Sequence, residues 1–129
     1  KPIVGRGSAF ADIDGDGDLD VVLTQLHGAP MLLRNDRPAG NHWLRVKLVG
    51  KSANRDAIGA WVQVKAGGQT QRMQVMPTRS YLSQSETVVT FGLGSTAAID
   101  ALEISWPDGS FQKAPAPPVD KLAVIGQGQ

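Results

Sequence analysis

The chain has no cysteine and no long apolar segment. With 129 residues it can bury an ordinary hydrophobic core without disulfide bonds, so the missing cysteines do not argue against a folded domain. No stretch approaches the roughly 18 apolar residues of a membrane-spanning helix, and we expect no membrane insertion. Lysine and arginine are scattered without a basic run, so we expect no nucleic-acid binding either.

A signal peptide is also missing. The chain opens with "KPIVGRGS" and has no initiator methionine, so we expect it to be a piece of a longer protein. The missing signal peptide therefore does not decide the compartment.

Residues for catalysis are scarce. Glu86 and Glu103 are the only glutamates, so a glycosidase with two catalytic carboxylates would have to use aspartates of residues 12–20. His27 and His42 are not spaced as a metal-binding pair and are predicted to lie on the surface. The serines of "SYLSQSE" (80–86) lack a G-x-S-x-G elbow. We expect no catalytic residues and no enzymatic activity.

Alternation of apolar and polar residues, with 15 glycines and 8 prolines between short runs, indicates an all-β fold. The turn sequences "KAGGQT" (65–70) and "WPDGSF" (106–111) predict hairpins, because glycine supplies positive φ and proline presets the first turn residue. The predicted strands are 7–11, 20–25, 30–35, 42–49, 59–66, 69–76, 87–91, 99–106, 110–113 and 121–126.

The polar stretch "NDRPAGN" (35–41) is the expected boundary between two parts, 1–38 and 39–129. The second part is predicted to be an antiparallel β-sandwich, preceded by a single hairpin in the first part. The residues expected to face the core are Val46, Leu48, Val62, Val64, Met73, Val75, Phe91, Leu93, Leu102, Ile104 and Trp106.

The stretch "FADIDGDGDLDVV" (10–22) concentrates negative charge. The overall charge is +1, but residues 12–20 alone carry −5. Neighbouring carboxylates this close repel by about 3 kcal/mol per pair at an effective dielectric near 20, so a cation is expected among them. Odd spacing turns the side chains of Asp12, Asp14, Asp16 and Asp20 toward one point, and Asp18 would add its main-chain carbonyl. This all-oxygen set predicts a Ca²⁺ site.

Three other interpretations compete with this one. An EF-hand requires a bidentate Glu at position 12 of the loop, which is Leu23 here, and flanking helices where strands are predicted. A haloacid-dehalogenase-like phosphatase would use Asp12 as nucleophile and Asp14 as acid or base, but it needs a βαβ body. A solvated acidic turn without metal would leave the glycine placement unexplained.

The loop "FADIDGDGDLDVVL" resembles the FG-GAP/VCBS-type repeat, the calcium hairpin of integrin α-chain propellers and of related bacterial secreted proteins. The resemblance implies a propeller-blade-like hairpin with Asp12, Asp14, Asp16 and Asp20 as side-chain ligands. One copy cannot close a propeller, which needs about four or more blades. The hairpin would thus end a truncated propeller or dock on the part that follows.

The second part carries its own resemblance. The segments "NRDAIGAWVQV" (54–64), "SYLSQSE" (80–86), "FGLG" (91–94) and "LEISWPDGSFQ" (102–112) resemble the ASPIC/UnbV domain, which follows such repeats in the cartilage acidic protein family and in bacterial exported proteins. This resemblance implies an exported or cell-surface protein. Residues 116–129 carry no resemblance.

Two tryptophans are predicted to face outward. Trp43 shares its face with Arg45 and Lys47, and Trp61 alternates with the core positions of its strand. Outward tryptophans stack on sugar rings or pack against a neighbouring module. The expected function is therefore a calcium-stabilised, non-catalytic structural and protein-interaction module, partnered by a protein or by preceding blades. The alternative is a carbohydrate-binding module using Trp43 and Trp61.

An extracellular, cell-surface or periplasmic location is expected from the metal site as well. A site of carboxylates and one carbonyl, with no bidentate Glu, is predicted to bind calcium with modest affinity. Such a site fills where calcium is near millimolar, as it is outside cells.

Overall fold

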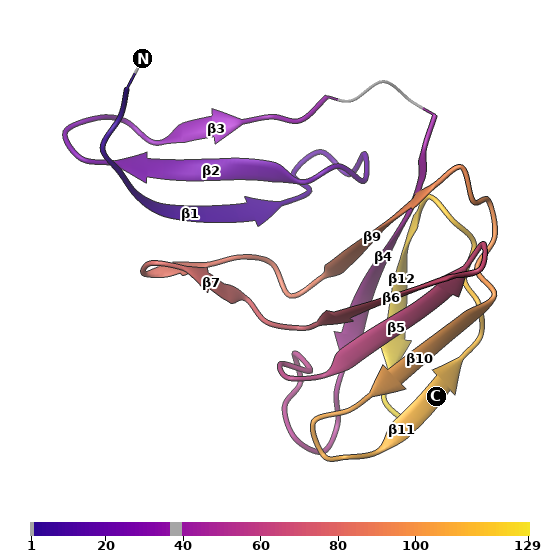
Figure 1. The fold of residues 1–129 in the computed structure, drawn as a ribbon. Helices are drawn as coiled ribbons and strands as arrows, with labels where there is room; N and C mark the ends of the chain where they lie inside the picture. The colour runs from indigo at the N-terminus through magenta and orange to yellow at the C-terminus, as the bar shows by residue number, and fades with distance from the viewer. Residues whose placement is uncertain (1, 37–39) are drawn as a thin grey trace. The chain divides into compact units, whose positions relative to one another are not determined.

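A computed structural model describes residues 2–36 and 40–129. The described chain consists of strands and connecting turns (Figure 1) and contains no helix with the length and hydrophobicity of a membrane span. It divides into two compact units. The N-terminal unit is Lys1–Pro38 with Pro77–Glu86, and the sandwich unit is Ala39–Met76 with Thr87–Gln129. The boundary expected within 35–41 overlaps residues 37–39, which lie outside the described residues.

The sandwich unit contains two sheets. A four-stranded sheet has the order β11-β10-β5-β6, and a three-stranded sheet has the order β12-β4-β9. The strands are β4 (His42–Val49), β5 (Trp61–Ala66), β6 (Gln69–Gln74), β9 (Val89–Gly94), β10 (Ala101–Ser105), β11 (Phe111–Ala114) and β12 (Lys121–Gly126). The predicted all-β sandwich is confirmed, and strands 42–49 and 121–126 have the predicted bounds.

Apolar side chains from both sheets form one core. Leu44 and Val46 of β4 meet Val62 of β5 and Ile104 of β10 there, and each of the four is fully buried. This is the result of period-two alternation, which turns every second side chain of a strand to the same face. All the positions predicted to face inward belong to this core, with Met73 partly buried at its border.

Both predicted hairpin turns form. Gly67 and Gly68 adopt φ of 55° and 75° between β5 and β6, and Gly109 adopts 86° between β10 and β11. One pairing departs from the antiparallel expectation, because β12 runs parallel to β4 from Lys121 opposite Leu44 onward. The Pro-rich stretch 114–120 makes this crossover connection from β11 to the other sheet.

The N-terminal unit is built on a three-stranded antiparallel sheet. Its strands are β1 (Gly5–Ala11), β2 (Asp20–Gln25) and β3 (Met31–Leu33), in the order β1-β2-β3. The predicted hairpin is thus present, and the acidic loop connects β1 to β2. Strand β3 is shorter than the predicted 30–35.

Two short strands that the sequence did not predict complete the N-terminal unit. They are β7 (Thr78–Ser80) and β8 (Ser83–Gln84), which form a small hairpin. This hairpin, called here the arm (residues 77–86), contacts β1. The Ser85 hydroxyl accepts a hydrogen bond from the Phe10 N–H at 3.2 Å, and the Glu86 N–H donates to the Phe10 carbonyl at 3.4 Å. The arm therefore belongs structurally to the sheet that carries the acidic loop.

Candidate metal centre

The acidic loop is held at both ends by paired strands. Ala11 of β1 lies opposite Asp20 of β2, so residues 12–19 must turn back within the width of one strand pair. Gly15 and Gly17 have φ of 81° and 92°, which favour glycine because a Cβ is strained in this region. The two glycines thus let the chain fold tightly enough to bring its carboxylates together.

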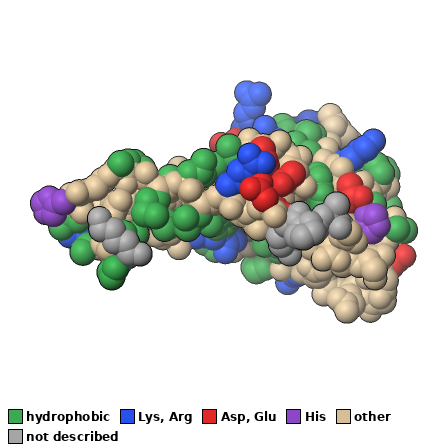
Figure 2. Space-filling model, turned by 90° about the horizontal axis from the view of Figure 1, so that it is seen from above, with side chains coloured by type: hydrophobic (Ala, Val, Ile, Leu, Met, Phe, Trp, Pro, Cys, Tyr) green, Lys and Arg blue, Asp and Glu red, His purple; other side chains and the backbone are tan. Residues whose placement is uncertain are grey.

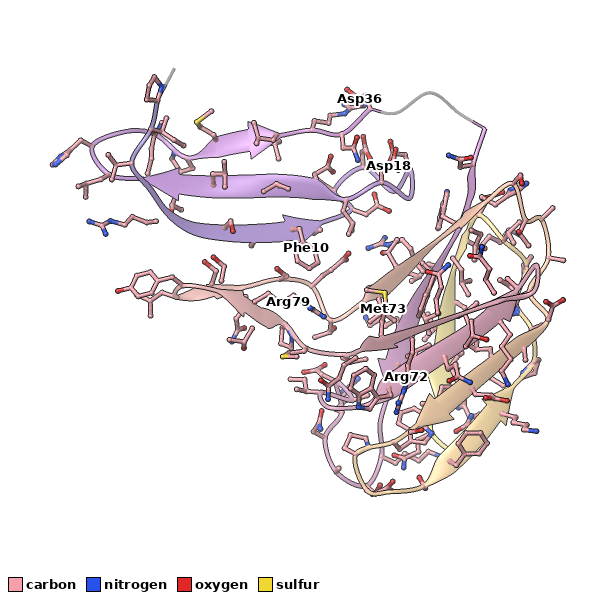
Figure 3. All side chains as sticks on the ribbon, viewed as in Figure 1. Phe10, Asp18, Asp36, Arg72, Met73 and Arg79 are labelled. Carbon is pink, nitrogen blue, oxygen red and sulfur yellow. The ribbon has the colours of Figure 1, made fainter. Side chains whose placement is uncertain are left out.

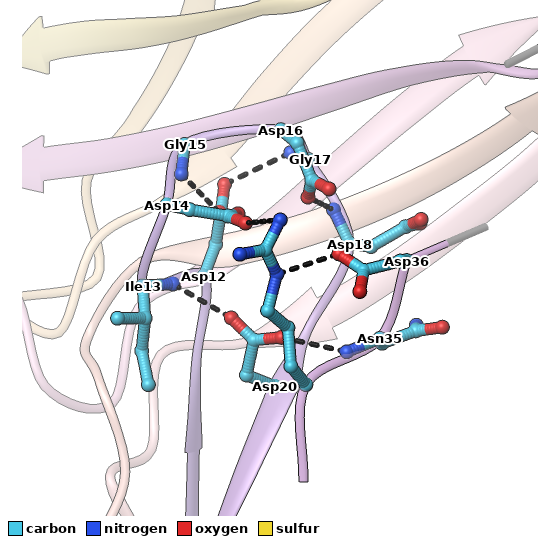
Figure 4. A network of polar contacts seen from close by, with 11 residues as sticks. Asp12, Ile13, Asp14, Gly15, Asp16, Gly17, Asp18, Asp20, Asn35 and Asp36 are labelled. Atoms are coloured by element: carbon cyan, nitrogen blue, oxygen red, sulfur yellow. Dashed lines mark hydrogen bonds and ion pairs between the residues drawn. The ribbon is translucent and has the colours of Figure 1, made fainter. Parts of the chain in front are cut away.

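The side chain of Asp12 organises the loop from inside. Its two carboxylate oxygens accept hydrogen bonds from the N–H groups of Gly15 at 2.7 Å and Gly17 at 3.1 Å. Further along, Asp16 accepts a bond from the Asp18 N–H at 2.9 Å. Figure 4 shows how these bonds curl the backbone around the carboxylates. The aspartates therefore fix the backbone of the loop by hydrogen bonds and also give it its negative charge.

Asp20 is the buried member of the group, with only 2% of its surface exposed. One oxygen accepts a bond from the Ile13 N–H at 3.0 Å, and the other accepts one from the Asn35 N–H at 2.9 Å. These bonds, that of Asn35 foremost, lower the pKa of Asp20, and the charge of Arg34 adds to them, while burial opposes them. Asp20 therefore stays ionised and ties the start of the loop to the segment after β3.

Among the described residues, two groups of carboxylates at this end of the sheet could each hold a metal ion. The first is Asp12, Asp14 and Asp20, and the second is Asp14, Asp16 and Asp36. In each group one oxygen per residue lies within 4.8 Å of the others. Asp14 belongs to both groups, so the candidate centre is one continuous array of oxygens graded from the buried Asp20 to exposed residues at the rim.

Arg34 brings a positive charge into this array. Its Nη2 lies 3.1 Å from Asp14 Oδ2, and its Nε lies 2.5 Å from Asp36 Oδ1. Asp36, through a hydrogen bond and its charge, and then Asp14 raise the pKa of the Arg34 guanidinium above its ordinary value. Arg34 thus neutralises part of the negative charge of the loop.

The donor set fits one class of ligand. Carboxylate oxygens without nitrogen or sulfur donors suit hard cations such as Ca²⁺. The strands on both sides of the loop exclude an EF-hand, which needs a helix on each side. The described residues also contain no βαβ body for a phosphatase of the dehalogenase type.

Asp12, Asp14 and Asp20 form one group, Asp16 joins Asp14 in the other, and the side chain of Asp18 belongs to neither. Asp36, which was not predicted, follows β3 at the end of the sheet where Asp18 lies (Figure 3) and joins Asp14 and Asp16. The pairing of β2 with β3 is what places Asp36 near the loop. Val21 lies opposite Leu33, so extending this antiparallel register places Arg34 opposite Asp20 and Asp36 opposite Asp18.

The two outward tryptophans do not converge on one site. Trp43 alternates with the core residue Leu44 of the three-stranded sheet, and Trp61 precedes the core residue Val62 of the four-stranded sheet. Outer faces of two sheets that share a core point in opposite directions. The guanidinium of Arg72 also lies 4.3 Å from the ring centroid of Trp61, and so covers one face of that ring.

Known proteins resemble this chain over most of its length. It is 35% identical over 113 residues to Cartilage acidic protein 1 of Xenopus tropicalis, a match that covers 83% of the chain. The proteins of that name from Homo sapiens and Mus musculus are each 34% identical over the same length. The matches cover only 16–17% of these relatives, so the chain spans about one sixth of their length.

A family description also matches the chain. The ASPIC and UnbV family matches residues 50–129, which include both the sandwich strands from β5 onward and the arm. Neither this description nor the relatives' names designates a catalytic activity. Because the match extends over more than half of its residues, the chain belongs to the ASPIC and UnbV family.

Proposed function

We propose that this chain is a calcium-stabilised, non-catalytic structural and protein-interaction module of an exported or cell-surface protein. The proposal is carried by one observation: two sets of three aspartate carboxylates lie close together and share Asp14. Each gathers three carboxylates, and such a concentration of negative charge is stable when a divalent cation neutralises it. Calcium is the fitting ion, because it accepts six to eight oxygen ligands in flexible geometry.

The resemblance of the loop to the FG-GAP/VCBS-type repeat gives the calcium a role in the fold. The ion would fix the β1-β2 connection of a blade-like sheet, with Asp12, Asp14, Asp16 and Asp20 as side-chain ligands. Asp36 fits as a further ligand at the rim. In this proposal Asp18 binds the ion through its main-chain carbonyl oxygen, and its side chain lies outside both groups.

The sheet of the N-terminal unit presents apolar residues on both faces. Val21 pairs with Leu33 on one face, and Val22 pairs with Leu32 on the other. Val22, Leu32 and Leu33 are 37%, 56% and 47% exposed, and Figure 2 shows apolar side chains gathered over this sheet. A sheet that is apolar on both faces is normally covered on both. We infer that preceding blades of the same longer chain, or a protein partner, cover it.

The length of the relatives supports this interpretation, because about five sixths of each lies outside the match and leaves room for further blades. Their name, Cartilage acidic protein 1, is consistent with a location outside cells. A calcium site of modest affinity is also useful only where calcium is near millimolar. These points support an extracellular, cell-surface or periplasmic location.

Calcium binding is tested by thermal unfolding of the parent chain in EDTA and in excess calcium. A ligand that binds only the folded state at a hundredfold excess over its Kd adds about 2.7 kcal/mol. Calcium should therefore raise the melting temperature of the parent. Asp14→Asn should lose most of this rise, because it removes a charge from both groups.

Asp18→Asn is the matched control, since it removes the same charge from the same loop outside both groups. It should keep most of the calcium-dependent rise. No rise in the parent would defeat the proposal. Equal rises in the parent and both variants would show that calcium acts elsewhere on the chain.

The carbohydrate-binding alternative gains no support from the geometry. The outer tryptophans lie on different sheets, and Arg72 occupies one face of Trp61. Glycan-array binding that disappears in Trp61→Ala would nevertheless establish it. The protein-interaction proposal predicts no such binding.

A further inference from the structure

Arg34 contacts carboxylate oxygens that a bound cation would also contact. Its guanidinium lies between Asp14 Oδ2, at 3.1 Å, and Asp36 Oδ1, at 2.5 Å. Asp14 and Asp36 both belong to the second carboxylate group, and Asp14 also belongs to the first. The arginine therefore contacts Asp14, the residue that the two groups share.

The backbone delivers Arg34 to this position. It follows β3 directly, and the next residue, Asn35, donates its N–H to the buried Asp20 at 2.9 Å. The start of the side chain is thus fixed beside the loop. The side chain is 60% exposed, so its end has room to turn into solvent once the two ion pairs break. The guanidinium can therefore leave the carboxylates without any change in the sheet.

A guanidinium and a calcium ion compete for these oxygens, so the binding of one weakens the binding of the other. Arginine donates N–H bonds to a carboxylate oxygen, whereas calcium must itself accept that oxygen's lone pair. The two cations also repel each other. We propose that Arg34 is an internal counter-ion that competes with calcium for Asp14 and Asp36, so that it lowers the calcium affinity and stabilises the loop when calcium is scarce.

This inference rests on the proposed calcium binding and adds a residue that sets its strength. A divalent and a monovalent cation about 6 Å apart in water repel by roughly the equivalent of a tenfold change in affinity. Removing the guanidinium should therefore tighten calcium binding. It should also destabilise the calcium-free loop, because the carboxylates then lose their counter-ion.

The test compares the parent with Arg34→Gln, which keeps a side chain of similar length without the charge. Calorimetric titration with calcium chloride should give a Kd roughly tenfold lower for Arg34→Gln at low ionic strength. The difference should shrink as salt is added, because exposed charges are screened. In EDTA the same variant should melt at a lower temperature than the parent.

Arg6→Gln is the matched control. Arg6 is exposed on β1, near the pairing of Gly5 with Gln25, whereas the acidic loop is at the opposite end of these strands. This variant should match the parent in both measurements. An effect as large as that of Arg34→Gln would overturn the inference, because net charge alone would then explain it.

The remaining outcomes separate the inference from the proposed function. If the parent binds calcium and Arg34→Gln binds it equally or more weakly, the competition is wrong and the calcium site stands. If neither protein binds calcium, both proposals fail. Binding by Arg34→Gln but not by the parent would support the competition, while the proposed calcium stabilisation of the parent would fail.

Discussion

Ser8 and Ser80 are 72 positions apart in the sequence, yet the Ser80 hydroxyl accepts a hydrogen bond from the Ser8 N–H at 3.2 Å. The two hydroxyl groups also lie 3.2 Å apart. Ser80 belongs to the arm, which is inside the region that matches the ASPIC and UnbV family, and Ser8 belongs to β1 of the sheet that carries the acidic loop. The family domain therefore contributes a hairpin to the unit that precedes it.

The serine contacts predict how strongly the arm is held. Ser85→Ala removes the acceptor for the Phe10 N–H, and Ser80→Ala removes the acceptor for the Ser8 N–H. Each loss should cost about 1 kcal/mol of local stability. Hydrogen exchange should become faster at the amide whose acceptor is removed. Ser95→Ala, an exposed serine of the sandwich unit, is the control and should leave both amides protected. Unchanged exchange in both arm variants would contradict the prediction.

A chain cut at the expected boundary tests the arm in another way. The fragment 39–129 would keep the sandwich strands but lose β1, against which the arm rests. We expect the fragment to retain a strand-rich circular dichroism spectrum, while protease cleaves it within 77–86. The intact chain serves as the control and should resist cleavage there. Equal resistance of fragment and intact chain would show that the arm is stable without β1.

The sequence predicted the strands whose alternation is regular. In β4, for example, Leu44, Val46 and Leu48 face the core and the predicted bounds are those observed, although Arg45 between them is buried as well. Alternation says which face a residue takes but not which strand is its neighbour, so the parallel pairing of β12 was not predictable. The arm was missed because β7 and β8 are too short to show alternation.

The candidate metal centre was also predicted from the sequence only in part. The aspartates of 12–20 were predictable because they lie in one short loop. Asp36 and Arg34 were not, because they reach the loop only through the pairing of β2 with β3. The burial of Asp20 also depends on a contact distant in sequence, the N–H of Asn35. Spacing alone therefore identified the ligand class but not the full set of charges.

Gly15 offers a clean test of backbone strain in the acidic loop. Its φ is 81°, and an added Cβ would meet nothing within 4 Å, so Gly15→Ala changes only the backbone preference. We expect a loss of about 1 kcal/mol in urea unfolding without calcium. Gly5→Ala is the matched control, because its Cβ would also meet open space and its φ is not in the positive range. A loss as large in Gly5→Ala would show that the φ of Gly15 is not the cause.

Asp108 should make the sandwich unit sensitive to acid. The hydroxyl of Ser110, followed by that of Ser52, holds the pKa of Asp108 well below its ordinary value of 3.8, and Gln127 adds a further bond. A pKa lowered by folding stabilises the folded state above the unfolded pKa, and this stabilisation is lost as the pH falls through the folded pKa. The melting temperature of the parent should therefore fall on acidification below about pH 4.

The variant Asp108→Asn should melt lower than the parent at neutral pH and lose less on acidification. Its control is Asp56→Asn, which changes an exposed aspartate of the same unit. That control should follow the parent at every pH. An acid-dependent loss in Asp108→Asn as large as that of the parent would mean that other carboxylates cause it.

Asp20 and Asp14 should separate the structural and metal-binding roles of the acidic loop. Asp20 is buried, and each of its oxygens accepts a backbone N–H, so Asp20→Asn would set an NH₂ group against one of those donors. This variant should melt lower than the parent even in EDTA. Asp14 is more exposed, and a variant that loses its pairing with Arg34 also loses one of the carboxylates that repel each other, so the two effects offset each other. Asp14→Asn should therefore melt close to the parent in EDTA and differ from it only when calcium is present. If Asp20→Asn is unchanged in EDTA, its two backbone hydrogen bonds do not hold the loop, and its carboxylate would matter only as a metal ligand.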